Sequence, residues 1–137
     1  MQVAETGPSA RDACGSANDI ARKRVVIFGG EILLDGGIVA NVGETWEFGK
    51  AVWTKVATAG PAPIVGPLLV YTGSNTLLYN PTDGTTWTWD GAHWTERQRL
   101  GPGSRPGAAA AYDSRRERVA LFGGAQSQDT WELPEIA

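Results

Sequence analysis

The sequence predicts an all-β fold built from repeated units of four antiparallel strands. The 137 residues include 18 glycines, eight prolines and six tryptophans. Gly and Pro interrupt helices, and Trp fills pleated surfaces, so short strands and tight turns are expected. Two stretches also begin alike, RVVIFGG at 24–30 and RVALFGG at 118–124. A Trp-containing segment with period-two alternation, which is typical of a strand, follows each of them.

The similarity between the two copies extends well beyond the shared double glycine. Residues 11–30 align with residues 105–124 without a gap, and nine of the twenty positions are identical. A third and less similar copy lies between them, with GPLLVY at 66–71 and LYNP at 78–81 in place of Leu-Phe-Gly-Gly. The chain therefore carries three copies of one unit.

Each copy predicts the same strands in the same order. An Ala- or Leu-rich strand follows a Gly-Pro segment, and a Val/Leu/Phe strand comes next. The third strand is the Trp-containing segment, ETWEF at 44–48, TTWTW at 85–89 and DTWEL at 129–133. In the first two copies a tight turn then leads to an outer Trp-Thr strand, and Asp90-Gly91 is a strong hairpin signal.

The spacing of the tryptophans defines the length of the unit. Trp46, Trp87 and Trp131 stand 41 and 44 residues apart, a period typical of four-stranded repeats. These features resemble the kelch repeat of β-propellers, in its bacterial form, over nearly the whole chain. The resemblance implies three kelch-like blades, at about 8–56, 61–97 and 102–133.

Three such blades are too few to close a ring, because propellers have about four to eight. Each open flank is expected to expose apolar surface on the order of 800 Å², more than a soluble monomer usually tolerates. We therefore expect a head-to-tail homodimer that closes as a six-bladed propeller, with residues 1–5 of each chain completing the outer strand of the other's third blade. The alternative is a fragment or remnant of a longer propeller.

Composition argues against several classes of partner. The net charge of −3 gives no global reason to bind nucleic acid or an anionic membrane. No apolar run approaches the roughly 20 residues that span a bilayer. Cys14 is the one cysteine, so no internal disulfide is possible, and the start of the chain lacks the features of a signal peptide. A cytoplasmic location is expected.

The inventory of reactive side chains argues against catalysis. His93 is the only histidine, so a histidine-rich metal site is excluded, and we interpret it as a turn residue. Cys14 falls on a predicted inner strand with no histidine to activate it, which favours a small packing residue. We expect no catalytic residue, no metal site and no cofactor.

One set of loops is the expected binding surface. In four-stranded blades, the connection before the first strand and the one between the second and third strands share one face, and loops on a rigid scaffold commonly bind ligands. The longest of these connections is residues 31–44, EILLDGGIVANVGE. It either binds a ligand or serves as apolar cover, at the ring or across the dimer, through Ile32, Leu33, Leu34, Ile38 and Val39. The candidate ligand-binding residues on this face are Arg11, Asp12, Glu31, Asp35, Asn41 and Arg105.

Two of these candidates, Arg11 and Arg105, occupy the same position in their copies. A guanidinium is a fork of donors that suits a carboxylate or phosphate ligand. The alternative is a structural role, in which each arginine bonds loop carbonyls or a nearby acid. For Asp19 and Asp113, which also recur, we expect a structural role as caps of the turns that follow them.

The function predicted from these observations is a non-enzymatic binding or interaction scaffold that binds its ligand at the loop face carrying residues 31–44, and the sequence does not identify the ligand. A carbohydrate-binding module is the alternative, because flat tryptophan rings stack on sugars. Trp46, Trp87 and Trp131 recur at equivalent positions, however, which favours packing between blades.

Overall fold

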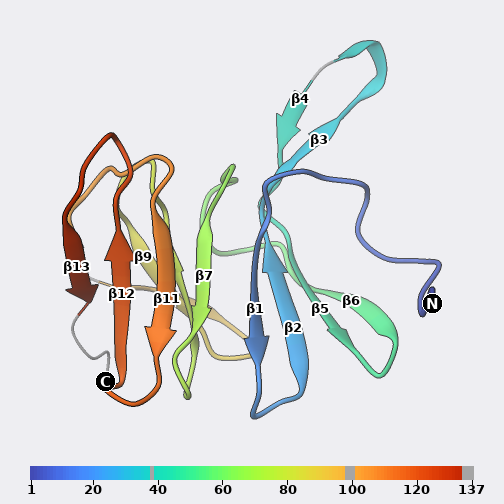
Figure 1. Cartoon of the computed structure of the whole chain (residues 1–137). Coiled ribbons are helices and arrows are strands. Elements are labelled where there is room, and N and C mark those ends of the chain that lie inside the picture. Colours follow the sequence, from blue (N-terminus) through green and yellow to red (C-terminus); the bar gives the residue numbers. More distant parts are fainter. Residues whose placement is uncertain (38, 98–100, 134–137) are drawn as a thin grey trace.

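The computed structural model describes residues 1–37, 39–97 and 101–133, and the all-β prediction is confirmed. Three antiparallel sheets stand side by side in an open row (Figure 1). Sheet 1 contains β1 (Gly15–Asp19), β2 (Arg24–Phe28), β5 (Thr45–Gly49) and β6 (Val52–Ala57). Sheet 2 contains β7 (Leu68–Tyr71), β8 (Thr76–Tyr79), β9 (Thr86–Trp89) and β10 (Trp94–Arg97). Sheet 3 contains β11 (Ala109–Asp113), β12 (Arg118–Phe122) and β13 (Thr130–Leu133).

The sheets meet along their first strands. In each sheet the strands follow chain order, and β1, β7 and β11 lie next to one another across the row. Side chains alternate between the two faces of a strand. We call the face that carries the third-strand tryptophan (Trp46, Trp87 or Trp131) the A face, and the opposite one the B face. The B face of one sheet packs on the A face of the next.

The joint between sheets 1 and 2 is an apolar cluster. The B face of sheet 1 contributes Val26 and Phe28, both with no exposed surface, and the A face of sheet 2 contributes Leu69, Leu78 and Trp89. Complete burial of one such side chain stabilises by about 1.5–3 kcal/mol. This joint therefore stabilises the two sheets against each other.

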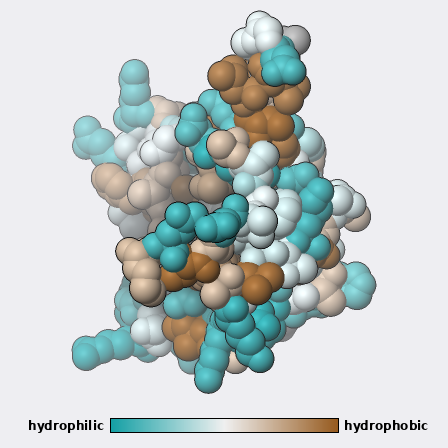
Figure 2. Space-filling model, turned by 90° about the vertical axis from the view of Figure 1, so that its right-hand side faces the viewer, coloured by the Kyte–Doolittle hydropathy of each residue, from teal (hydrophilic) through white to brown (hydrophobic). Residues whose placement is uncertain are grey.

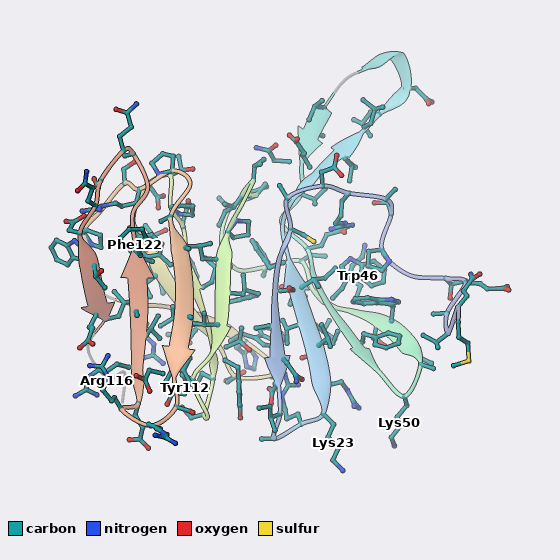
Figure 3. The ribbon with its side chains drawn as sticks, in the orientation of Figure 1. Lys23, Trp46, Lys50, Tyr112, Arg116 and Phe122 are labelled. Carbon is teal, nitrogen blue, oxygen red and sulfur yellow. The ribbon has the colours of Figure 1, made fainter. Side chains whose placement is uncertain are left out.

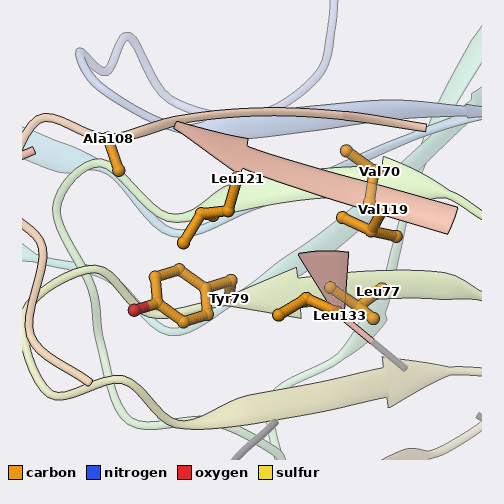
Figure 4. Packing of buried hydrophobic residues seen from close by; sticks show 7 residues of the cluster. All are labelled: Val70, Leu77, Tyr79, Ala108, Val119, Leu121 and Leu133. Atoms are coloured by element: carbon orange, nitrogen blue, oxygen red, sulfur yellow. The ribbon is translucent and has the colours of Figure 1, made fainter. Parts of the chain in front are cut away.

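A second cluster joins sheets 2 and 3 (Figure 4). Val70, Leu77 and Tyr79 point from the B face of sheet 2 toward sheet 3. The members from the third copy are Ala108, Val119, Leu121 and Leu133. Both clusters contain the apolar positions of the repeat, which explains why the copies share them.

The predicted turns are confirmed. The Asp19 carboxylate accepts a hydrogen bond from the Arg22 amide at 3.0 Å, and Asp113 caps its own turn in the same way. Asp90 Oδ1 accepts hydrogen bonds from the backbone amides of Ala92 and His93, at 2.8 and 2.7 Å. Gly91 in this hairpin has a φ of 100°, which glycine adopts without strain.

The long connection between β2 and β5 is a hairpin, which the sequence interpretation did not anticipate. It consists of β3 (Glu31–Leu33), a 3₁₀ turn η1 (Asp35–Gly37) and β4 (Val39–Asn41), and its two strands pair with each other. Gly36 and Gly37 have φ near 80°, which permits the turn. The hairpin projects beyond the ends of the sheets (Figure 1). Ile38 lies outside the described residues.

Residues 1–5 form no strand within the chain, and Gly7 lies against Trp53 of β6. The pairing expected for residues 1–5 involves a second chain and stays a prediction.

In the part of the chain that the structure describes, no helix is long and apolar enough for a membrane span.

Candidate binding face

The loops of the expected binding face lie together at one end of the strands, along one side of the row of sheets. The chain enters β1, β7 and β11 there, and the connections β2–β5, β8–β9 and β12–β13 lie at the same end (Figure 1). We call this end the loop face. The hairpin β3–β4 rises from it.

Apolar side chains at the distal part of this hairpin are in solvent. Leu33 is 74% exposed, and Leu34 and Val39 are also exposed. Figure 2 shows the hairpin as a projecting hydrophobic lobe. Within this chain Leu33, Leu34 and Val39 are exposed. The alternative that the insert caps the ring or packs across a dimer involves a second chain and stays a prediction.

The base of the hairpin is held firmly. Asp12 and Glu31 exchange two backbone hydrogen bonds, at 3.0 and 2.9 Å. The Val42 amide donates to the Gly30 carbonyl at 3.0 Å. These bonds fix where the hairpin leaves sheet 1, and the distal residues are presented at a defined place.

Four of the candidate ligand-binding residues lie on or beside the hairpin. Glu31 pairs with Asn41 across the two strands and with Asp12 at the bridge, so these three come together at the base. Asp35 lies at the turn, away from them. All but Glu31, which is half-buried, are exposed.

The Arg11 guanidinium is hydrogen-bonded to groups of its own copy. Its guanidinium donates to Glu44 Oε2 at 2.9 Å, to the Gly29 carbonyl at 3.4 Å and to the Ser9 carbonyl at 3.2 Å. Trp46 Nε1 donates to the same Glu44 oxygen at 3.0 Å. The bond from Trp46, with those from Arg11 and Lys55, lowers the pKa of Glu44 to about 2, so this carboxylate is ionised at neutral pH.

Arg105 makes the equivalent contacts in the third copy. Its guanidinium binds both oxygens of Asp129, one of them at 2.8 Å, and donates to the Gly123 carbonyl at 3.2 Å. Trp131 Nε1 donates to Asp129 Oδ2 at 2.9 Å. The Arg105 bond, followed by that of Trp131, holds the pKa of Asp129 well below its usual range. Arg11 and Arg105 thus tie the loop before the first strand to the connection before the third.

The second copy shows that this arrangement is a unit. Ile64 stands where the other copies have arginine, and Thr85 stands where they have Glu44 or Asp129. Ile64 is buried in the cluster between sheets 1 and 2. The arginine and the acid are absent together, as expected if each serves the other. Sequence interpretation missed Glu44 and Asp129, although both stand two residues before a recurring tryptophan.

The residues associated with chemistry are apart from one another. Among the described residues, no cluster of three or more His, Cys, Asp or Glu could hold a metal ion. Cys14 is half-buried just before β1, and His93 is exposed in the β9–β10 turn.

A cavity of about 300 Å³ opens between sheets 2 and 3 at the end opposite the loop face. It is lined by polar and apolar groups that include Thr72, Asn75, Tyr112 and Glu117.

The tryptophans do not all pack between sheets. Trp89 is buried there, and Trp87 and Trp94 pack against the same cluster. Trp131 is exposed over more than a third of its surface, and Arg105 lies 6.0 Å from its ring centroid. Packing between sheets therefore explains part of the tryptophan pattern, and the bond to the acid two residues earlier explains another part.

No protein-family model matches the chain, and no curated protein matches it. The solved structure of YjhT is similar with a TM-score of 0.40 and 13% sequence identity, over 83% of this chain and 59% of that one. The chain thus spans less than two thirds of the length of that protein.

Proposed function

We propose that this chain is a kelch-like half-propeller, completed to six blades by a second copy, that acts as a non-enzymatic binding scaffold. Its ligand is a protein, bound at the hairpin β3–β4 on the loop face. The observation that supports this proposal is the exposure of Leu33, Leu34 and Val39 on a hairpin anchored at its base.

The chemistry of the hairpin suits a protein partner with an apolar pocket. A few apolar anchors that enter a pocket commonly supply most of the binding energy of an interface. The backbone bonds of Asp12 and Glu31 hold the hairpin in place before binding, which reduces the entropy lost on association. Glu31 and Asp35 add negative charge beside the anchors, so basic groups are expected around the partner's pocket.

Affinity capture with two baits tests this proposal. The wild-type chain and the double variant L33S/V39S are used on extract of the source cells, with V52S as the matched control. Val52 is 58% exposed on a different hairpin, so its replacement removes a comparable apolar group. A protein retained by the wild type and by V52S, but lost with L33S/V39S, supports the proposal once its binding is reproduced with purified components. Equal retention by all three baits contradicts it.

Carbohydrate binding is the second candidate, because the Trp131 ring is partly exposed. A sugar would stack on the side of the ring that Arg105 leaves free. A glycan array with the wild type and W131A tests this function. A signal that disappears with W131A and persists with L33S/V39S would favour the carbohydrate over the protein ligand.

A further inference from the structure

The row of sheets ends in two free faces, the A face of sheet 1 and the B face of sheet 3. Phe28 on the B face of sheet 1 has no exposed surface, because sheet 2 covers it. Phe122 is the equivalent residue of sheet 3 and is 54% exposed. The phenylalanine at this position of the repeat is therefore buried in sheet 1 and exposed in sheet 3.

The free face of sheet 3 repeats the covered B face of sheet 1 in detail. In sheet 1, Arg22 pairs with Asp19 at 2.6 Å and with Glu47 at 2.5 Å. In sheet 3, Arg116 pairs with Asp113 at 2.9 Å and with Glu132. The matching pairs are Phe28 and Phe122, Thr45 and Thr130, Glu47 and Glu132, and Arg22 and Arg116.

The covered face shows what these residues bind. The Phe28 ring meets the Trp94 ring of sheet 2 edge-on, with centroids 5.5 Å apart. Trp94 Nε1 donates to Thr45 Oγ1 at 2.8 Å, and Trp89 Nε1 donates to Glu47 at 3.3 Å. The B face therefore recognises two indole groups on the A face that lies against it.

The free A face of sheet 1 has one of these two indoles and a phenyl ring in place of the other. Trp53 takes the position of Trp94, and Phe48 takes that of Trp89, with ring centroids 5.0 Å apart. Ile27 takes the position of Leu78. The chain thus carries counterparts of both faces of this joint, one at each end of the row, although Phe48 has no N–H to donate to Glu132. Figure 3 labels Phe122 and Arg116 at one end and Lys23, Trp46 and Lys50 at the other.

We propose that the free B face of sheet 3 binds the free A face of sheet 1 of a second copy of this chain. Phe122 packs on Trp53 of the second copy, and the Trp53 indole donates to Thr130. Two such contacts, related by a half-turn, close a ring of two chains. Both contacts are heterologous, because each joins two different faces.

Charge supports the same pairing. A hollow on the A face of sheet 1 is lined by Lys23, Arg24 and Lys50, together with apolar side chains such as Val25. Asp113 and Glu132 would face this hollow. In the joint between sheets 1 and 2, Gly91 lies against Arg22. Lys50 has the position of Gly91 in the first copy, so the proposed contact has a lysine where that joint has a glycine. By this equivalence Lys50 would lie against the Arg116 guanidinium, so its ammonium reaches Asp113 and Glu132 once that flexible side chain shifts.

This inference rests on the half-propeller part of the proposed function and is independent of the hairpin. The residues involved lie on β2, β5, β6, β11, β12 and β13 and in the turns β1–β2, β5–β6 and β11–β12, and none lies on β3 or β4. Loss of the ring and loss of the ligand are therefore separable by experiment, since L33S/V39S is expected to leave the solution mass unchanged.

Molecular mass in solution is the primary measurement. Light scattering after gel filtration is expected to give twice the chain mass of 14.5 kDa for the wild type. F122D places a carboxylate against Trp53 of the second copy and is expected to give the monomer. V52D, equally exposed but outside both free faces, is expected to remain a dimer. A monomeric wild type, or dimeric F122D, would overturn the proposal.

A mixing experiment tests whether the contact is head-to-tail. V25D disrupts the opposite face, since Val25 is partly exposed on the A face of sheet 1, and alone it is expected to be monomeric. A mixture of F122D and V25D retains one joint made of two wild-type faces, so it is expected to form a dimer. A face-to-face contact between two copies of sheet 3 predicts that V25D alone stays dimeric, and that result would refute the proposed pairing.

Discussion

At the scale of single residues, the recurring unit is an arginine, an acid and a tryptophan that share hydrogen bonds. Glu44 receives bonds from Arg11, Trp46 and Lys55, at 2.9, 3.0 and 3.1 Å. Two loops far apart in the sequence are joined through this one carboxylate. Its loss leaves the largely buried Arg11 guanidinium without its ionic partner, which is costly in a protein.

The substitution E44Q tests this role through pH. The pKa of Glu44 is about 2 in the folded chain against 4.5 for a free side chain, so ionisation stabilises the folded state above pH 4.5. That stability is lost as the pH falls from 4.5 toward 2. We expect E44Q to lower the free energy of unfolding by roughly 1–2 kcal/mol at pH 7, and to lower it much less at pH 3.

Denaturant unfolding at the two pH values measures this difference. E5Q is the control, because Glu5 is exposed. A deficit of E44Q that is the same at pH 3 and pH 7 would show that the carboxylate charge contributes nothing and that only the shape of the side chain matters.

A glycine contact joins the loops of sheets 2 and 3. Gly84 has a φ of 80°, and a Cβ at this position would lie 2.5 Å from the Gly103 backbone. Gly66 has a similar φ of 70° with open space around it. An alanine at either site costs about 1–2 kcal/mol for its backbone conformation. We expect G84A to cost clearly more than G66A in thermal unfolding, and equal losses would show that the backbones separate easily.

At the scale of elements, the hairpin β3–β4 is expected to be dispensable for folding. Apart from the bridge between Asp12 and Glu31 at its base, its strands pair only with each other, and Leu33, Leu34 and Val39 are exposed. Replacing residues 32–41 by a short glycine turn is therefore expected to change the free energy of unfolding by less than about 1 kcal/mol, because an isolated hairpin is marginally stable. The same variant is expected to lose ligand binding. Unfolding of the shortened chain at much lower denaturant would assign the hairpin a structural role.

The strands were predictable from the sequence because each carries a local signal. Alternation around Trp46, Trp87 and Trp131 gave the third strands, and the period placed the rest. The hairpin was missed although Asp35-Gly36 stands between two apolar runs, the same signal that was used correctly at Asp90-Gly91.

The contacts of the candidate site were less predictable. Arg11 and Glu44 are 33 residues apart, and Arg105 and Asp129 are 24 apart. No local pattern pairs them, and only the shared absence of both groups in the second copy carries the information. The exposure of Leu33 and Val39 also depends on the direction in which the hairpin leaves the sheet, which is a property of the fold.

At the scale of the whole molecule, the proposed ring links stability to concentration. If unfolding separates two chains, a tenfold rise in protein concentration favours the folded dimer by about 1.4 kcal/mol. For a dimer of this size we expect the melting temperature to rise by about 2 °C for each tenfold increase. F122D is expected to melt lower, at a temperature that does not depend on concentration, since each of its chains unfolds alone. Scanning calorimetry over two decades of concentration measures both slopes. A flat wild-type slope would show that the free faces of sheets 1 and 3 add nothing to stability through a second copy, whereas a rising slope that F122D removes would place that stabilisation at the Phe122 face.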